Sequence, residues 1–136
     1  MNVKYLTYEE VVEIHDSLIL EFGGSFGIRD QLAIQSALNQ PKQSAFGHEF
    51  YPTLPEKAAA LGFFLTMNHG FVDGNKRTAI QTMEVVLVAN GWFLEAIIDE
   101  KEMVILEVAM GNLNREGFAT WVTARSKPLQ ENLLDD

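Results

Sequence analysis

The sequence contains no cysteine and no long hydrophobic run. A chain without cysteine forms neither disulfides nor thiolate metal sites, and a reducing compartment is its simplest location. No apolar stretch approaches the roughly 18 residues that a membrane helix needs. The N-terminal residues MNVKYLTYEE also lack the apolar region of a signal peptide. We therefore expect a cytoplasmic protein that does not contact a membrane.

Basic residues are scarce as well. The chain has 10 lysines and arginines against 19 acidic residues, for a formal net charge of −9. Because nucleic-acid backbones bind basic surfaces, we expect no direct nucleic-acid binding. A local exception is the adjacent pair Lys76 and Arg77, whose only acidic neighbour within residues 69–82 is Asp73. Two neighbouring cations more often form a solvated helix face than a site, so this pair needs further support.

The length of 136 residues and the hydrophobic fraction of 47% indicate one globular domain. The sequence contains no internal repeat, low-complexity stretch or linker. We assign residues 1–128 to this domain and expect residues 129–136, which follow Pro128, to form a frayed tail.

The first predicted helix covers residues 7–22. Thr7 and Glu10 have the spacing of a capping box, in which each side chain satisfies a free backbone amide of the other residue. Apolar residues recur at helical spacing along the segment and predict one inward-facing stripe, made up of Val11, Ile14, Leu18 and Phe22.

Further capping and breaking residues predict the other helices. In chain order these are a short helix between Asp30 and Pro41, a helix from Pro55 to residue 70, a helix over residues 75–89, a helix capped by Asp99 and Glu102, and a last helix from Asn114. Residues 42–54 are expected to form a short flap-like loop or hairpin, and residues 92–96 an irregular or extended connector. The predicted fold class is all-α, a single-domain bundle of about six helices.

Residues 69–77, His-Gly-Phe-Val-Asp-Gly-Asn-Lys-Arg, connect two of these helices. Asp-Gly and Gly-Asn favour tight turns, and a tight turn that enters a helix points several backbone amides at one spot. Such a spot binds anions through the amides and the helix dipole. Lys76 and Arg77 place positive charge at the helix end where acids are usually preferred, which favours a bound phosphate.

Three side chains of this segment have distinct expected roles. Asp73 is a hard oxygen ligand that could hold Mg²⁺ together with phosphate oxygens. A histidine titrates near neutral pH, which suits His69 to act as a general base. Phe71 is large and apolar, so we expect it to plug into the core and anchor the segment.

A purely structural interpretation fits the same residues. Most helix connections rich in Gly, Asn and Asp are only turns, and a histidine at a helix end commonly bonds the last free carbonyls. The residues alone support both interpretations equally.

The segment resembles the signature of the Fic/Doc family, His-x-Phe-x-(Asp/Glu)-(Gly/Ala)-Asn-(Gly/Lys)-Arg. Every specified position is filled, by His69, Phe71, Asp73, Gly74, Asn75, Lys76 and Arg77. The glycine-rich stretch 23–29 and the connector at 90–91 also resemble death-on-curing (Doc) toxins, so the resemblance covers nearly the whole chain. It implies a helical Fic/Doc fold and a nucleotide-dependent protein hydroxyl transferase.

One position of the signature distinguishes two activities. Most members with glycine before the arginine transfer AMP, whereas Doc-like members with lysine there resemble kinases, and this chain has Lys76. The resemblance therefore implies transfer of the γ-phosphate of ATP, with Mg²⁺, to a threonine of elongation factor Tu, which blocks translation. The implied catalytic residues are His69, Lys76 and Arg77, and the implied nucleotide-binding residues are Asp73 (also the Mg²⁺ ligand), Gly74, Asn75, Lys76 and Arg77.

The resemblance also implies an inhibitor. Fic proteins often carry an inhibitory Ser/Thr-x-x-x-Glu-Gly/Asn helix, but here the stretch from Ser17 to Glu21 is followed by Phe22. We therefore expect an inhibitor in trans, a Phd-like antitoxin whose C-terminal segment docks in a groove of the toxin.

Two other functions stay open. One is an AMP transferase on the same scaffold, which Lys76 disfavours. The other is an inactive helical module that only binds a partner, which the joint presence of a base, His69, and a metal ligand, Asp73, disfavours.

Several residues outside the signature are discounted. His15 is expected to be partly exposed and without a role, and Trp92 and Trp121 are expected to belong to the core. His48 and the aromatic residues of 42–54 are expected either to line a flap that docks the target or to pack the loop down.

Overall fold

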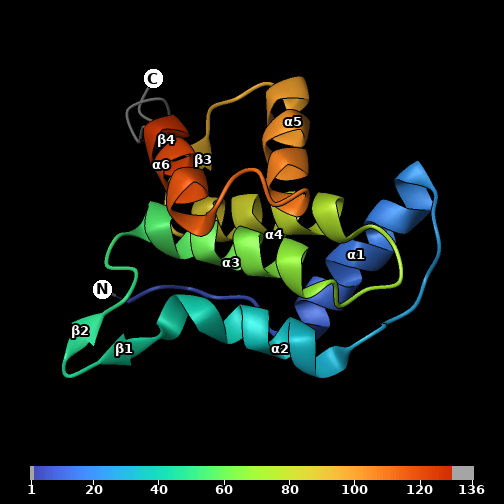
Figure 1. Cartoon of the computed structure of the whole chain (residues 1–136), viewed down its shortest axis with the longest axis horizontal. Coiled ribbons are helices and arrows are strands. Elements are labelled where there is room, and N and C mark those ends of the chain that lie inside the picture. Colours follow the sequence, from blue (N-terminus) through green and yellow to red (C-terminus); the bar gives the residue numbers. More distant parts are fainter. Residues whose placement is uncertain (1, 130–136) are drawn as a thin grey trace, which may run out of the picture.

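The computed structural model describes residues 2–129 (Figure 1). Within them, six α-helices supply nearly all regular structure, which confirms the all-α prediction. The predicted frayed tail lies outside the described residues except for Leu129, whose amide donates to the Gly91 carbonyl at 2.8 Å. The assignment of residues 1–128 to one domain stays a prediction.

The elements follow in the predicted order. The helices are α1 (Tyr8–Phe22), α2 (Gln31–Asn39), α3 (Leu54–Asn68), α4 (Asn75–Ala89), α5 (Ile98–Ala109) and α6 (Arg115–Arg125), with a 3₁₀ turn η1 (Gln40–Lys42) after α2. The short strands are β1 (Ser44–Ala45), β2 (His48–Glu49), β3 (Trp92–Leu94) and β4 (Ser126–Pro128). None of the helices within residues 2–129 has the length and apolar character that crossing a membrane requires.

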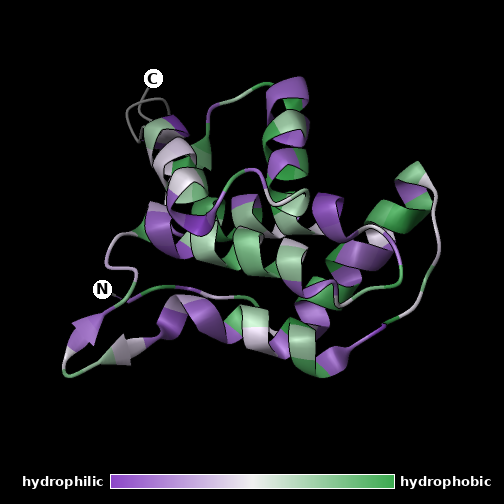
Figure 2. Ribbon diagram, in the orientation of Figure 1, coloured by the Kyte–Doolittle hydropathy of each residue, from purple (hydrophilic) through white to green (hydrophobic). Residues whose placement is uncertain are grey.

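Helix α3 forms the centre of the bundle. It packs against α2, α4, α5 and α6, and every residue from 57 to 62 is buried. A helix that is buried on all sides needs an apolar surface all round, and Figure 2 shows hydrophobic residues along most of α3. The buried middle of α3 therefore fixes the helix whose C-terminal end leads into the following turn.

The buried face of α1 differs from the predicted one. Val11, His15 and Ile19 are the buried residues, at a spacing of four, whereas Ile14, Leu18 and Phe22 line a surface groove against α4. The predicted stripe was therefore wrong apart from Val11. The face that is buried was hard to predict from the sequence, because its central residue, His15, is polar and interrupts the apolar pattern.

Capping residues behave as predicted at three helices and not at a fourth. Thr7 and Glu10 form the capping box of α1, Asp30 caps α2 and Asn114 caps α6. The predicted cap of α5 is wrong, since this helix begins after Ile97 without a side-chain cap and Asp99 lies in its first turn. An acid there still interacts favourably with the helix dipole.

The two predicted non-helical segments form strands. Residues 42–54 contain the antiparallel β1–β2 hairpin, as expected. The connector after α4 contributes β3, which pairs antiparallel with β4 from the end of the described chain. Sequence analysis did not predict β4, because its pairing depends on residues more than thirty positions away. Trp92 and Trp121 are partly buried and pack against the core cluster, close to expectation.

Gly70 illustrates how tightly α2 packs below the end of α3. A Cβ atom added to Gly70 would overlap Cγ1 of Ile34 and approach the Asp30 carbonyl oxygen at 3.2 Å.

We therefore expect Gly70→Ala to lower the free energy of unfolding by about 2–3 kcal/mol through overpacking. The matched control is Gly111→Ala, where nothing lies within 4 Å and only the positive φ of 80° is unfavourable, for a cost of about 1 kcal/mol. Urea unfolding followed by circular dichroism measures both. Equal losses in the two variants would contradict this packing account.

Candidate active site

The segment of residues 69–77, here called the motif turn, leaves α3 and enters α4 through two left-handed residues. His69 ends α3 with φ 50° and ψ 52°, and Gly74 precedes α4 with φ 78° and ψ 17°. In Figure 1 the turn lies beside α1, at the end of α3 opposite the β1–β2 hairpin. These two residues bend the chain so that the signature residues gather around the start of α4.

A second segment, residues 24–30, braces the motif turn and is here called the strap. The Val72 amide donates to Gly27 O at 3.0 Å, and the amides of Arg29 and Asp30 both donate to Gly70 O, at 2.8 and 2.9 Å. Ile28 and Phe71 form an isolated antiparallel bridge. The strap thus acts as a short partner strand for the turn.

The Arg29 side chain adds a further brace. Its Nε donates to the His69 carbonyl at 2.6 Å and its Nη2 donates to the Asn68 carbonyl at 3.2 Å. These are carbonyls that the end of α3 leaves without helical partners, and a cation there also suits the helix dipole. The sequence analysis did not assign this role to Arg29. The available signal was its position directly before the helix cap Asp30, as a cation for which no partner had been predicted.

Asn75 fixes the interior of the turn. Its Oδ1 accepts the Phe71 amide and its Nδ2 donates to the Phe71 carbonyl, both at 2.9 Å, and the residue is buried. The same Nδ2 lies 3.5 Å from His69 Nδ1. The Asn75 side chain therefore bonds the Phe71 backbone, and only the backbone N–H of Asn75 remains free to bind a ligand.

Asp73 carries an exposed carboxylate that two backbone amides hold in place. Oδ2 accepts the Ser25 amide at 3.1 Å and Oδ1 accepts the Gly74 amide at 2.8 Å. These hydrogen bonds, with Ser25 the larger cause, hold the pKa of Asp73 below its usual value, and the charges of His15 and Lys76 lower it further. The carboxylate is therefore ionised at neutral pH.

The donor set fits a Mg²⁺ ion that is shared with a phosphate. Each Asp73 oxygen uses only one lone pair on an amide, and one carboxylate plus phosphate oxygens is a common way to hold Mg²⁺. Within residues 2–129, no cluster of three or more acidic or histidine side chains could hold a metal ion by itself. The residues present thus suit a metal that arrives with its substrate.

The start of α4 offers free backbone donors. In the described part of the chain, the amides of Asn75, Lys76 and Arg77 have no hydrogen-bond acceptor, and no side chain caps the helix. Converging free amides at a helix start form an anion site. Lys76 and Arg77 are exposed at the same turn, and the Arg77 guanidinium lies 4.2 Å from the centre of the Phe22 ring.

Two hollows flank the motif turn and share residues 73–76. The His69 hollow, of about 350 Å³, also has Thr66, Met67, Val72 and Ala109 in its wall. The Arg77 hollow, of about 330 Å³, is closed by the end of α1 and by Gly23 and Gly24. The structure therefore brings His69, Asp73, Gly74, Asn75 and Lys76 together, and places Arg77 on the other side of Lys76.

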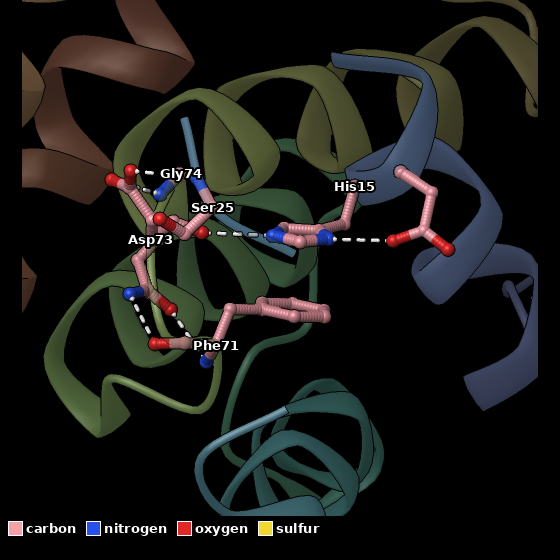
Figure 3. A network of polar contacts seen from close by, with 7 residues as sticks. His15, Ser25, Phe71, Asp73 and Gly74 are labelled. Carbon is pink, nitrogen blue, oxygen red and sulfur yellow. Dashed lines mark hydrogen bonds and ion pairs between the residues drawn. The ribbon is translucent and has the colours of Figure 1, made fainter. Parts of the chain in front are cut away.

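His15 was predicted to be partly exposed, and this prediction is wrong. The residue is 1% exposed, and its Nε2 lies 2.8 Å from the Asp73 carbonyl oxygen (Figure 3). Its ring stacks on Phe71, which is itself 1% exposed, as predicted for an anchor of the turn. The signal in the sequence was a histidine four residues from the buried Val11 and Ile19, where a polar group requires a partner.

The hairpin does not border this site. It lies at the N-terminal end of α3 and the motif turn at the C-terminal end, roughly 20 Å apart along a helix of this length (Figure 1). Lys57 of α3 attaches the hairpin to this helix, because its Nζ donates to Glu49 Oε1 at 2.7 Å and to Tyr51 O at 2.6 Å. Tyr51 is buried, whereas Phe46, His48 and Phe50 are exposed. The predicted docking of a target beside the site by this loop is therefore not supported.

Known proteins share this sequence pattern. A sequence model of the Fic/DOC family matches residues 5–87. The chain is 36% identical over 118 residues to Toxin Doc of Mycolicibacterium smegmatis, covering 85% of this chain and 88% of that protein. It is 27% identical over 106 residues to Protein kinase doc of Escherichia phage P1, covering 78% of this chain and 81% of that protein. Residues 5–87, which the family model matches, contain α1, the strap and the whole motif turn.

We expect Arg29→Ala to loosen the motif turn. Losing the donor leaves two carbonyls at the end of α3 without a protein partner, at a cost of about 1 kcal/mol, since the site is exposed to water. Hydrogen exchange of the Val72 amide should accelerate more than exchange in α6. The control is Arg125→Ala, which removes a similarly exposed cation from its ion pair with Glu100. Unchanged exchange at Val72 would mean that the Arg29 side chain does not brace the turn.

Proposed function

The chain belongs to the Fic/Doc family, and on that premise we propose that it is a Doc-like toxin which transfers the γ-phosphate of ATP to a protein hydroxyl. The observation that carries the proposal is Lys76, exposed at the free amide row of α4 and facing both hollows. The relative from Escherichia phage P1 bears the name of a protein kinase. A transferase of this kind needs positioning and charge stabilisation more than covalent chemistry.

The motif turn would divide the work of the reaction. The amides of residues 75–77 would bind phosphate oxygens, with Lys76 and Arg77 neutralising the negative charge that spreads over the transferred group. Asp73 would hold Mg²⁺, whose positive charge would offset the negative charge of the phosphates. Hydrogen bonds from the Ser25 and Gly74 amides lower the pKa of the Asp73 carboxyl and orient it, so this group loses no proton when it binds the metal ion.

His69 would act on the nucleophile. The target hydroxyl would enter the His69 hollow, give its proton to the imidazole, and form a bond to the γ-phosphorus. The bond from the γ-phosphorus to the β,γ-bridging oxygen would break in the same step, and ADP would leave with that electron pair. His69 is exposed, so its imidazole is accessible to a substrate. Its backbone carbonyl accepts a hydrogen bond from Arg29, which fixes the position of the main chain that carries the base.

An AMP transferase is the second candidate. The reaction would need the α-phosphate beside His69 and the terminal phosphates further into the amide row. The lysine at residue 76 lines both hollows and adds bulk and charge there, which favours the phosphoryl-transfer orientation. The proposed protein target is a threonine of elongation factor Tu, which follows from the resemblance to Doc toxins and not from a feature of the site.

The proposed partner is an antitoxin that docks in the groove between α1 and α4. The groove has a volume of about 650 Å³ and an apolar floor with acids on its rim, lined by Leu6, Ile14, Leu18, Phe22, Val85, Gln81, Glu10, Glu13 and Glu21. An amphipathic helix with basic residues beside its apolar face matches this lining. Leu18 and Phe22 also line the Arg77 hollow, so a segment in the groove would reach the nucleotide side of the site.

We expect His69→Ala to abolish growth arrest on expression. Asparagine tolerates the left-handed backbone better than alanine, so His69→Asn should show the same loss with less strain. His48→Ala is the control, since His48 is an exposed histidine on the hairpin. Growth arrest that persists in a folded His69 variant would favour the inactive binding module over an enzyme.

Lys76→Gly should reduce transfer of the γ-phosphate from labelled ATP by about tenfold or more, because one cation leaves the phosphate site. Any AMP transfer gained would appear as label from the α-phosphate. Lys76→Met separates the two effects of the lysine, since it keeps the bulk of the side chain and removes the charge. Undiminished γ-phosphate transfer by Lys76→Gly would remove the argument from this residue.

Glu13→Lys should weaken neutralisation by the cognate antitoxin while leaving growth arrest intact, because it reverses the charge of the groove rim. Co-expression with the antitoxin measures this effect. Glu102→Lys is the control, an exposed acid on α5 away from the groove. Full neutralisation of the Glu13 variant would argue against a basic partner in this groove.

A further inference from the structure

His15 is a buried polar residue that the proposed reaction does not use. Its Nε2 lies 2.8 Å from the Asp73 carbonyl oxygen, and its Nδ1 lies 2.9 Å from Asp16 Oδ1. Figure 3 shows the imidazole between α1 and the motif turn, above the Phe71 ring. The two rings stack with 3.9 Å between centroids and 5° between planes. A Cβ atom on Gly74 would lie 3.6 Å from this imidazole, so the ring also forms a wall of the turn.

The hydrogen bond to Asp73 controls more than one atom. A carbonyl oxygen only accepts, so His15 Nε2 is the donor. The peptide unit that carries this oxygen also carries the Gly74 N–H, which donates to Asp73 Oδ1 at 2.8 Å. Because a peptide unit is planar, fixing the oxygen also fixes the direction of that N–H. The His15 ring therefore sets the orientation of the Asp73 carboxylate and of the peptide that opens α4.

Asp16 orients the His15 ring. The hydrogen bond at one imidazole nitrogen commonly decides which way the other nitrogen points. The Asp16 side chain is 48% exposed, whereas that of His15 is 1% exposed. The pair therefore links a surface carboxylate to the backbone of the site through one buried ring.

We propose that His15, oriented by Asp16, is a positioning residue that holds the Asp73 peptide and thereby pre-forms the carboxylate and the amide row for phosphate binding. The phosphate-binding part of this inference rests on the proposed function. The holding of the turn does not, since it follows from the hydrogen bonds and the stacking alone. Simple core packing is the competing explanation, because stacking on Phe71 would also stabilise the fold.

Three variants separate positioning from packing. His15→Leu removes the donor and keeps an apolar side chain, whereas His15→Gln presents an amide N–H at about the reach of Nε2. Val122→Ala destabilises the core from α6, where Val122 is buried, and this helix lies at the end of α3 opposite the motif turn (Figure 1). Positioning predicts that His15→Leu shifts the Gly74 and Lys76 amide resonances and speeds hydrogen exchange of the Gly74 amide, which donates to Asp73 Oδ1, with partial recovery in His15→Gln and no change in Val122→Ala.

Kinetics with ATP, Mg²⁺ and elongation factor Tu give the second readout. His15→Leu should raise the KM for ATP and lower kcat, together by roughly tenfold in kcat/KM, the scale of one buried hydrogen bond. His15→Gln should recover part of the loss. A Val122→Ala protein of equal or lower stability should keep the parental KM.

The surface partner keeps the test valid if the His15 variants fail to fold. Asp16→Ala should give the same amide shifts in weaker form, while Glu9→Ala, an exposed acid in the first turn of α1, should give none. Gly74 and Lys76 resonances that stay unchanged in the Asp16 variant and in any folded His15→Leu protein would overturn the proposal. If the parent protein transfers no phosphate, only the proposed function fails, because the resonances still decide whether His15 holds the turn.

Discussion

The turn that joins α3 to α4 depends on hydrogen bonds from distant parts of the chain. Its left-handed residues, His69 and Gly74, interrupt both helices, and the amides at the start of α4 have no acceptor among the described residues. A backbone whose donors have no partner in the protein has to be stabilised by other segments. The strap supplies bonds from one side and His15 from the other, while Asn75 closes the interior. The rest of the fold serves to bring these segments to one place.

The central position of α3 explains how the fold does this. The middle of α3 is buried in the core, and Phe71, which is 1% exposed, anchors the turn that follows this helix. The cations at residues 76 and 77 stand at the helix end where they are least favourable. That arrangement lowers the stability of the free protein, and under the proposed function a bound phosphate would offset this cost.

The sequence was sufficient to predict local features and insufficient for contacts between distant residues. Helix starts at Thr7, Asp30 and Asn114 were predictable because a cap acts within one turn. The anchor role of Phe71 followed from its size alone. By contrast, the buried face of α1, the brace from Arg29 and the pairing of β4 depend on residues far apart in the chain, which no local pattern encodes. The signature located the candidate site, but the residues that support this turn became visible only in the folded chain.

The most direct test is the intact mass of purified elongation factor Tu after incubation with this protein, ATP and Mg²⁺. A Doc-like kinase predicts a gain of one phosphate that disappears when His69 is replaced. A gain of one AMP would contradict the kinase assignment and leave the site in place. An unchanged mass would contradict elongation factor Tu as the target.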